Sequence, residues 1–440
     1  MKGGPMKEVR LAYGRTGLVV GVPDHAEVLA PSRLDPLDDQ AGAVVAALRA
    51  PVAGPPLGDV VAGAARRAAR AGSAGGPRVA VVFPDITRPM PNRTVLPPLL
   101  AELERAGVAP GGIELLCATG THRAATEEEL VELVGPEVVA RFPIHQHDAH
   151  READHVEVGR VDGVPVLLDR RYVEADVRIL TGFVEPHFFA GFSGGPKGAC
   201  PGLAALATVL EAHSPARIAH HDATWLTTRG NPVHDFVRAA AALAPPDLSL
   251  DVAIDDDRAL TAVFAGPLPE GHEAACRHVE DSAVRRVAAP FDVVLGTNGG
   301  YPLDRNLYQA VKGMAAAARV VRPGGTIVMA AACEDGTPGG GAFARLLEAA
   351  TDPEAMARGP RRPETDAWQV QVLGRVLGRA RVWLHAEGLG DDEVRAARLR
   401  PVADVGAAVE EALTGAGDEG RLGVLPLGPL TVATVAAPTD

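Results

Sequence analysis

The sequence has 440 residues, 47% of them hydrophobic and 22% charged, which is typical of a globular protein long enough for two or three domains. Its net charge of −13 argues against a nucleic-acid partner, because phosphate backbones select basic surfaces. The chain shows neither the roughly 18-residue apolar run of a membrane helix nor a signal-peptide core, and its four cysteines form no CxxC pair. We therefore expect a cytoplasmic protein with no membrane partner.

Short apolar runs alternate with helical patterns along the chain. The predicted strands are residues 79–83, 113–118, 177–182, 291–296 and 326–331, each followed by a loop that carries glycine, proline or polar residues. Helical patterns lie between them, and the one at 126–135 opens with the capping-box spacing of Thr126 and Glu129. Continuous apolar strands that alternate with helices indicate buried, mostly parallel sheets in an α/β protein.

A second series of strands and helices begins near residue 285, after the polar run GHEAACRHVEDSAVRR. We therefore predict an N-terminal α/β domain over residues 1–280, completed by 408–440, and a C-terminal α/β domain over 285–405. Ligands of open α/β sheets bind beyond the carboxyl ends of the strands, where the unusual polar residues of this chain lie. This predicts an active site in the cleft between the two domains.

Two polar loops follow the first two predicted strands. In DITRP (85–89), Arg88 offers a planar guanidinium that can clamp a carboxylate or phosphate, although a surface ion pair with Asp85 would also explain the motif. In ATGTHR (118–123), His122 projects from a loop that a ligand can approach, although a histidine at a strand end can also be purely structural.

The segment GFSGGPKGACPG (191–202) surrounds one lysine, Lys197, with glycines and prolines, directly after EPHFFA with His187. Successive backbone amides in such a loop can form an anion-binding site. A Walker motif does not fit, because the lysine is preceded by proline and no hydroxyl follows it to bind magnesium. The chain also has no GxGxxG after a strand with an acid about 20 residues on, which argues against a diffusible dinucleotide.

Four histidines lie within HQHDAHREADH (145–155), but their spacing matches no standard zinc signature. This predicts a polar, partly solvated loop rather than a metal site. His213, in LEAHSPARIAHHD, is by spacing alone one of 14 histidines.

DRNLYQAVKGM (304–314) follows the loop of the second domain's first strand and has the pattern of the first turns of a helix. Tyr308 and Lys312 are four residues apart and share a helix face, with Gln309 close by. Lys312 is either a solvated helix lysine or a group that reaches an anion held by Arg88.

Taken in order, these motifs resemble the lactate racemase family of nickel-pincer enzymes, and the resemblance covers most of the chain. It is carried by DITRP, GTHR, EPHFFAGFSGGPKGACPG, the EAH at 211–213 and LYQAVKGM. The resemblance implies a nickel-pincer nucleotide, a pyridinium-3-thioamide-5-thiocarboxylic acid mononucleotide that holds Ni(II) and is attached to a lysine. It also implies cofactor-biosynthesis proteins that load this group.

By motif position, the resemblance implies a role for each candidate residue. Lys197 would carry the thioamide tether, and His213 would be the protein's nickel ligand. His122 and His187 would be the two acid–base residues. The remaining implied contacts are Asp85, Thr87, Gly194 and Gly195 at the cofactor, and Arg88, Tyr308, Gln309 and Lys312 at the substrate carboxylate.

The residue types suit the inversion of a 2-hydroxy acid. The proton on C2 is barely acidic, so removal of hydride is easier if a base takes the hydroxyl proton at the same time. The planar ketoacid can then receive hydride on either face, which requires one base for each enantiomer, and histidine is poised near neutral pH. The cofactor would be the electron sink, and square-planar N/S coordination suits Ni(II).

We therefore predict a racemase or epimerase of lactate or a similar short 2-hydroxy acid. Pro196 stands where a larger or basic residue is expected in lactate-specific members, which leaves other 2-hydroxy acids open. One alternative is a divalent-metal-dependent hydrolase or lyase that uses His122 and His187 without a covalent cofactor. Another is a non-catalytic binding protein in which Lys197 only packs its loop.

Overall fold

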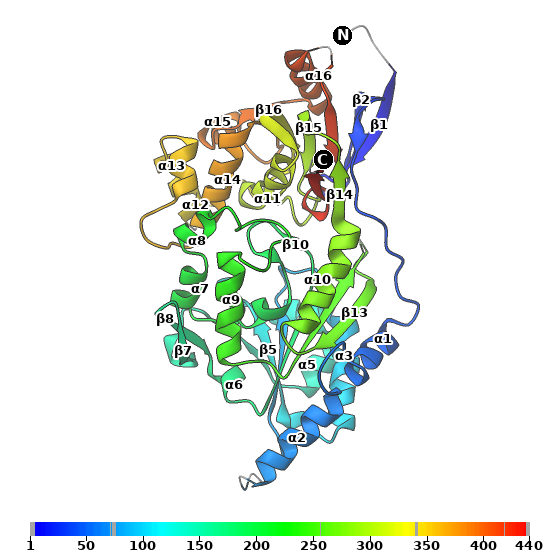
Figure 1. The fold of residues 1–440 in the computed structure, drawn as a ribbon, viewed down its shortest axis with the longest axis vertical. Helices are drawn as coiled ribbons and strands as arrows, with labels where there is room; N and C mark the ends of the chain where they lie inside the picture. The colour runs from blue at the N-terminus through cyan, green and yellow to red at the C-terminus, as the bar shows by residue number, and fades with distance from the viewer. Residues whose placement is uncertain are drawn as a thin grey trace. The chain divides into compact units, whose positions relative to one another are not determined.

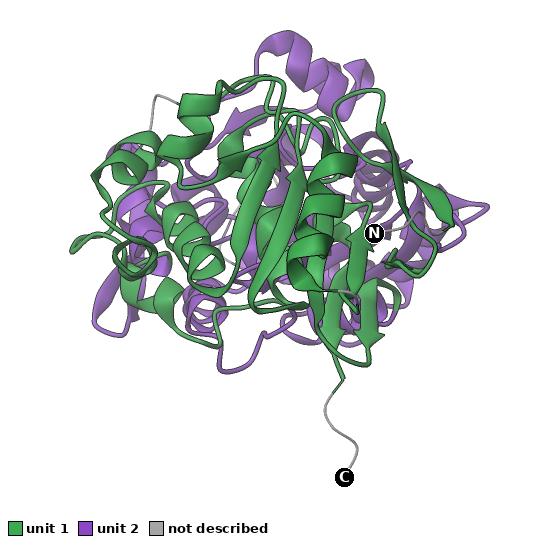
Figure 2. Ribbon diagram, turned by 90° about the horizontal axis from the view of Figure 1, so that it is seen from above, with its two compact units in different colours: residues 1–32, 213–225, 282–440 green, residues 33–212, 226–281 purple. Residues whose placement is uncertain are grey.

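The structure, a computed structural model, describes residues 5–70, 72, 76–255, 257–338, 342–417 and 419–436. The chain forms two compact units, each assembled from separate segments of the sequence (Figure 2). Unit 1 comprises Met1–Ser32, His213–Trp225 and Ser282–Asp440, and unit 2 comprises Arg33–Ala212 and Leu226–Asp281.

Unit 2 is built around a six-stranded sheet in the order β13–β12–β9–β4–β5–β6. Its strands are β4 (Val79–Pro84), β5 (Ile113–Ala118), β6 (Ile144–Gln146), β9 (Val177–Phe183), β12 (Leu248–Ile254) and β13 (Leu260–Gly266). Neighbouring strands are parallel except β12 and β13, which are antiparallel. The strands predicted at 79–83, 113–118 and 177–182 correspond to β4, β5 and β9, because their apolar residues are buried on both faces of the sheet.

Helices and two hairpins complete unit 2 (Figure 1). The helices are α1 (Gln40–Arg49), α2 (Leu57–Arg70), α3 (Asn92–Arg105), α4 (Glu127–Val134), α5 (Pro136–Arg141), α6 (Arg170–Val173), α7 (Leu206–Ala212), α9 (Pro232–Leu243) and α10 (Glu270–Ala283). The hairpins are β7 (His155–Val161) with β8 (Val164–Asp169), and β10 (Pro186–His187) with β11 (Gly191–Phe192). The capping box at α4 is confirmed, since Thr126 Oγ1 accepts the N–H of Glu129 at 3.2 Å and Glu129 Oε2 accepts that of Thr126 at 2.8 Å.

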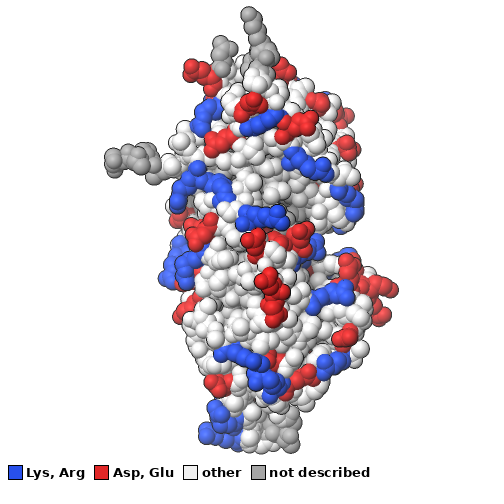
Figure 3. Space-filling model, turned by 90° about the vertical axis from the view of Figure 1, so that its right-hand side faces the viewer, with Lys and Arg blue, Asp and Glu red and all other residues white. Residues whose placement is uncertain are grey.

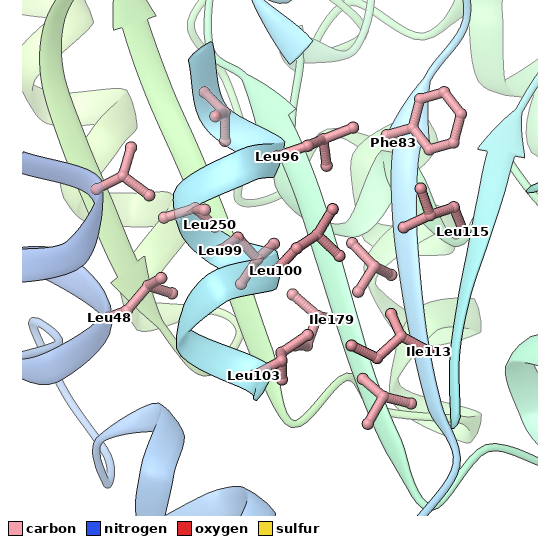
Figure 4. Close-up of a cluster of buried hydrophobic side chains, with 14 of the residues drawn as sticks. Leu48, Phe83, Leu96, Leu99, Leu100, Leu103, Ile113, Leu115, Ile179 and Leu250 are labelled. Atoms are coloured by element: carbon pink, nitrogen blue, oxygen red, sulfur yellow. The ribbon is translucent and has the colours of Figure 1, made fainter. Parts of the chain in front are cut away.

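The main core of unit 2 lies between α3 and the sheet. Leu96, Leu99, Leu100 and Leu103 recur every three or four residues, so they form one apolar stripe of α3. Figure 4 shows this stripe beside strand residues such as Ile113. The resulting packed layer fixes the carboxyl ends of β4 and β5, from which the predicted loops extend.

Unit 1 is built around a second six-stranded sheet, in the order β18–β17–β16–β15–β19–β3, with all neighbours parallel. Its strands are β3 (Glu27–Val28), β15 (Phe291–Thr297), β16 (Val321–Ala330), β17 (Arg381–His385), β18 (Arg400–Pro401) and β19 (Leu422–Leu425). The predictions at 291–296 and 326–331 correspond to β15 and the second half of β16. The mostly parallel α/β fold class is therefore confirmed.

The other elements of unit 1 surround this sheet, and Figure 2 shows helices on either side of its strands. They are the hairpin of β1 (Met6–Leu11) and β2 (Leu18–Pro23), and the parallel pair of β14 (Val284–Val287) and β20 (Val432–Val435). The helices are α8 (Pro215–Ala219), α11 (Leu307–Ala318), α12 (Ala342–Ala349), α13 (Pro353–Arg358), α14 (Ala367–Arg379), α15 (Asp391–Ala396) and α16 (Val405–Ala416).

The two units divide the chain differently from the predicted domains. Residues 408–436, expected to complete the N-terminal domain, lie in unit 1, because β19 pairs with β15 in its sheet; residues 437–440 lie outside the described part of the chain. The N-terminal segment joins unit 1 as well, since β3 pairs with β19. Residues 213–225 also belong to unit 1. The position of the active site between the two domains stays a prediction.

Among the described residues, no helix combines the length and the apolar character that crossing a membrane requires. Acidic and basic side chains are interspersed on the face drawn in Figure 3. That face therefore differs from the basic stripe typical of proteins that bind nucleic acids.

Candidate active site

The predicted site residues are divided between the two units. Unit 2 holds Asp85, Thr87, Arg88, His122, His187, Gly194, Gly195 and Lys197, and unit 1 holds His213, Tyr308, Gln309 and Lys312. Within each unit, the fold brings several of them together from distant parts of the sequence.

Asp85 and His122 meet at the carboxyl edge of the unit 2 sheet. Asp85 follows β4 and His122 follows β5, and these neighbouring strands are parallel, so their loops start at the same edge. His122 Nδ1 lies 2.9 Å from Asp85 Oδ2, and the Thr87 hydroxyl donates to Asp85 Oδ1 at 2.6 Å. The carboxylate therefore has Thr87 and His122 as hydrogen-bond partners, rather than forming the surface ion pair with Arg88 considered from the sequence.

The charge of Asp85 is maintained although the residue is only 3% exposed. Burial alone would raise the pKa of Asp85, but the hydrogen bonds from His122 and Thr87 and the positive charge of Arg88 outweigh it and lower the pKa. An ionised carboxylate can only accept, so Nδ1 of His122 carries a proton and donates it to the hydrogen bond. In neutral His122, the lone pair therefore lies on Nε2, as a general base requires.

His187 has the opposite hydrogen bonding at Nδ1. It lies in the hairpin of β10 and β11, where its Nδ1 accepts the N–H of Ala190 at 3.2 Å. The imidazole stacks on the ring of Phe188, with centroids 4.8 Å apart, and meets the ring of Phe189 edge-on at 4.6 Å. Since Nδ1 accepts, neutral His187 carries its proton on Nε2.

Lys197 lies in a tight turn beyond the carboxyl end of β9. A short 3₁₀ helix spans Gly195–Gly198, and the N–H of Lys197 donates to the carbonyl of Gly194 at 3.2 Å. Gly194 and Gly195 have φ angles of +76° and +50°, a region that favours glycine. Lys197 itself is half-buried.

The two glycines before Lys197 also make room for other side chains of the protein. A Cβ on Gly194 would lie 2.6 Å from Asp251 Oδ1, and a Cβ on Gly195 would lie 2.4 Å from His272 Cγ. Packing inside unit 2 therefore requires glycine at both positions, whatever ligand the loop binds. The contact of Gly194 and Gly195 with a cofactor stays a prediction.

Unit 1 brings His213 and Tyr308 to one side chain that the sequence analysis missed, Trp368. The indole N–H of Trp368 donates to the Tyr308 hydroxyl at 2.9 Å, and the Trp368 and His213 rings have centroids 4.8 Å apart. Tyr308 and Lys312 lie on α11, whose cap is Asn306. Trp368 belongs to no motif. The only signal in the sequence that could have found it is that tryptophan is large and rare, with three in the chain.

The structure corrects the prediction that residues 145–155 form a polar, partly solvated loop. His147 and His155 are 3% and 5% exposed, and their Nε2 atoms lie 2.9 Å apart, so a partly solvated loop is wrong for these two residues. The Thr119 hydroxyl donates to the carbonyl of His147 at 2.6 Å. His147 thereby connects to the loop that leads to His122.

Comparison with known proteins identifies the family. Residues 13–225 match the lactate racemase N-terminal domain, and residues 286–433 match the lactate racemase C-terminal domain. The lactate racemase of Thermoanaerobacterium thermosaccharolyticum is 33% identical over 356 residues, which cover 80% of this chain and 83% of that protein. The chain belongs to the lactate racemase family. The predicted family and the predicted enzyme class, an isomerase, are thereby confirmed.

Other relatives agree with this membership. The lactate racemase of Lactiplantibacillus plantarum is 33% identical over 357 residues, 80% of this chain and 83% of that protein. The structure of the lactate racemase apoprotein from T. thermosaccharolyticum superposes with a TM-score of 0.88 at 30% identity, over 98% of this chain and all of that one. A Thermotoga maritima protein shares the fold, with a TM-score of 0.62 at 20% identity over 86% of this chain and 97% of that chain.

Proposed function

We propose that this protein inverts C2 of lactate or a similar short 2-hydroxy acid, with a nickel-pincer nucleotide attached to Lys197. The observation that carries the proposal is the Asp85–His122 pair, in which His122 Nδ1 lies 2.9 Å from Asp85 Oδ2, in a chain of the lactate racemase family. A histidine held by a buried carboxylate is a base for a hydroxyl proton. That is the protein group which this reaction needs.

The residues present fit the nickel-pincer group. Lys197 offers an amine from a tight turn, and the imidazole of His213 offers a nitrogen ligand beside the Trp368 ring. Nitrogen and sulfur donors suit square-planar Ni(II). When bound, the cofactor would supply a reversible acceptor for the C2 hydride.

The residues of the chain would bind the acid and move its hydroxyl proton. The guanidinium of Arg88 would hold the substrate carboxylate through paired hydrogen bonds, with Tyr308, Gln309 and Lys312 as further contacts. His122 Nε2 would take the hydroxyl proton of one enantiomer, and Asp85 would stabilise the imidazolium that forms. His187 would serve the opposite face.

The same proposal includes the cellular compartment and the loading partners. All four cysteines are free and buried, which suits a reducing cytoplasm. Cofactor-biosynthesis proteins would be required as loading partners. Pro196 leaves the choice among 2-hydroxy acids open, and a short acid such as lactate is the starting substrate because the relatives are lactate racemases.

The test is to produce the chain together with the cofactor pathway and to measure the intact mass and nickel content. We expect an adduct on Lys197, about one nickel per chain, and racemisation of lactate or another acid in a panel of 2-hydroxy acids. The Lys197→Ala variant should lose adduct, nickel and activity in both directions. Unmodified Lys197 with turnover that depends on an added divalent ion would favour the hydrolase or lyase instead.

A further inference from the structure

A buried carboxylate on another element forms a hydrogen bond with the backbone of the turn that carries Lys197. Asp251 lies on β12 with 0% of its surface exposed, and its Oδ1 accepts the N–H of Gly195 at 2.9 Å. Its Oδ2 accepts the hydroxyl of Ser249 at 2.7 Å. Ser249 and Asp251 are two residues apart on the strand, so both side chains lie on the same face of the sheet.

Buried side chains of α9 and α10 hold the preceding part of the same segment. His272 Nε2 donates to the carbonyl of Ser193 at 2.8 Å, and His234 Nδ1 donates to that of Ala190 at 3.0 Å. Both histidines are 2% exposed, and their rings are stacked with centroids 5.8 Å apart. Asn231 Nδ2 adds a bond to the carbonyl of Phe189 at 2.9 Å. The backbone from residue 189 to 195 is thus bound by side chains from three other elements.

Asp251 differs from the other members of this set because it is a buried acid. Burying a carboxylate is costly, and its two hydrogen-bond donors here, an amide and a hydroxyl, are both neutral. The bond to the amide is made two residues before the lysine, at a glycine with no room for a Cβ.

We propose that Asp251 is a positioning residue of the lysine site, which fixes the N–H of Gly195 and thereby sets the turn that presents Lys197 for cofactor attachment. This inference rests on the proposed function, in which Lys197 carries the cofactor. A turn fixed before the cofactor arrives does not have to be ordered during attachment, so less entropy is lost. If Asp251 only packed β12, its loss would lower stability without changing the state of Lys197.

The test compares Asp251→Ala, Asp251→Asn and Ser249→Ala with the wild type. Asparagine keeps an oxygen acceptor for Gly195, and its amide can donate to the Ser249 hydroxyl, so it is the conservative variant. Ser249→Ala removes one bond from the carboxylate and leaves the bond to Gly195. Asp169→Asn is the matched control: Asp169 is 2% exposed in the same unit, and its carboxylate accepts the N–H of Arg171 at 2.9 Å.

Two readouts are needed, one of them independent of the loaded enzyme. In unloaded protein, hydrogen exchange at the amides of Gly195 and Lys197 should be about tenfold faster in Asp251→Ala, the size expected for one lost hydrogen bond, while exchange in β4 and β5 stays unchanged. In protein produced with the cofactor pathway, the fraction of Lys197 carrying the adduct should fall at least about twofold, because the turn must then be ordered during attachment. Asp251→Asn should recover most of both, and Asp169→Asn should match the wild type.

The outcomes separate this inference from the proposed function. Absence of the adduct in the wild type produced with the cofactor pathway would overturn both. A normal adduct in the wild type and an equal one in folded Asp251→Ala would overturn the inference alone. If Asp251→Ala does not fold, Asp251→Leu takes its place, because leucine has a similar shape but no acceptor for the Gly195 N–H. Unchanged exchange at Gly195 and an unchanged adduct fraction in that variant would overturn the inference, and faster exchange with a reduced adduct fraction would support it.

Discussion

At the scale of single residues, the two predicted acid–base histidines are not equivalent. Nδ1 of His122 donates to the Asp85 carboxylate, whereas Nδ1 of His187 accepts the N–H of Ala190. The sequence predicted both histidines as candidates, but a histidine's tautomer depends on partners that only the fold brings near. The two neutral imidazoles therefore differ in which nitrogen holds the proton.

This difference can be observed directly. In protein labelled with ¹⁵N-histidine at a pH where both rings are neutral, we expect the Nδ1–H tautomer for His122 and the Nε2–H tautomer for His187. Two-bond ¹H–¹⁵N spectra distinguish the tautomers, and His122→Gln and His187→Gln variants assign the signals. The same tautomer at both positions would contradict the hydrogen bonding described for the two loops.

We expect loss of the Asp85 carboxylate to lower activity strongly. In Asp85→Asn, the amide oxygen should stay with the Thr87 N–H and hydroxyl, which places the NH2 group opposite His122 Nδ1. The imidazole then loses both the acceptor that fixes its tautomer and the stabilisation of its protonated form. We expect kcat to fall by about 100-fold or more, as for other histidine bases that lose a carboxylate partner. The measurement is racemisation per adduct-bearing chain.

Thr87→Val is the control for this substitution. It removes the hydroxyl that donates to Asp85 Oδ1 at 2.6 Å but leaves the carboxylate and its bond to His122. A smaller loss of about tenfold is expected, because the carboxylate that accepts the His122 N–H remains, and tenfold corresponds to about 1.4 kcal/mol, close to the lower end for a hydrogen bond to a charged group. If both variants lose activity equally, Asp85 acts on the loop rather than on His122.

At the scale of elements, the sequence predicted loops at strand ends but not which strands are neighbours. The runs before DITRP and GTHR are β4 and β5, and their pairing is what places Asp85 beside His122. Asp251 and His272 could not be predicted as site residues, since each lies in an ordinary strand or helix with no motif. The polar residues at 145–155 led to a wrong prediction for a related reason. His147 is buried against Thr119, which is distant in sequence, and against His155, which no periodic pattern relates to it.

The buried pair of His147 and His155 should make stability depend on pH. Burial, and then the charge of His155, lower the pKa of His147 from 6.5 to about 4. The unfolded chain takes up this proton near pH 6.5, while the folded chain resists it until about pH 4. The contribution is therefore complete above pH 6.5 and is lost as the pH falls toward 4, by about 3 kcal/mol in total.

The measurement is urea unfolding between pH 7.5 and 4.5 for the wild type and His147→Gln. Other groups also titrate in this range, so the difference between the two proteins isolates the contribution of His147. The variant should be less stable at pH 7.5 but should lose less stability on acidification. Parallel curves across the whole range would show that His147 does not carry this pH dependence.

At the scale of the whole molecule, the alternation of apolar runs and helices was enough to predict the fold class. That pattern could not predict the boundaries of the units, because they depend on pairing between distant segments. β3 and β19 pair with each other in the sheet of unit 1, although almost the whole chain separates them. Residues 213–225 join the same unit from the middle of the sequence, and with them comes His213.

Two distant segments of unit 1, which carry His213 and Tyr308, meet at Trp368, and their different contacts with it predict separable effects. Trp368→Phe removes the indole N–H that donates to the Tyr308 hydroxyl but keeps an aromatic ring beside His213. If Tyr308 contacts the substrate carboxylate, KM should rise several-fold while nickel content stays near one per chain. Trp368→Ala also removes the ring, so the His213 imidazole loses its packing partner and nickel content should fall as well.

Nickel content by elemental analysis and racemisation kinetics on the same samples distinguish the two effects. The control is Phe343→Leu, which alters the ring that meets Tyr308 edge-on at 5.4 Å without touching Trp368. It should leave nickel content unchanged, because the substitution alters a ring that contacts Tyr308 and leaves the Trp368 ring beside His213 in place. Equal nickel loss in Trp368→Phe and Trp368→Ala would mean that the hydrogen bond to Tyr308, and not the ring beside His213, holds the predicted nickel ligand in place.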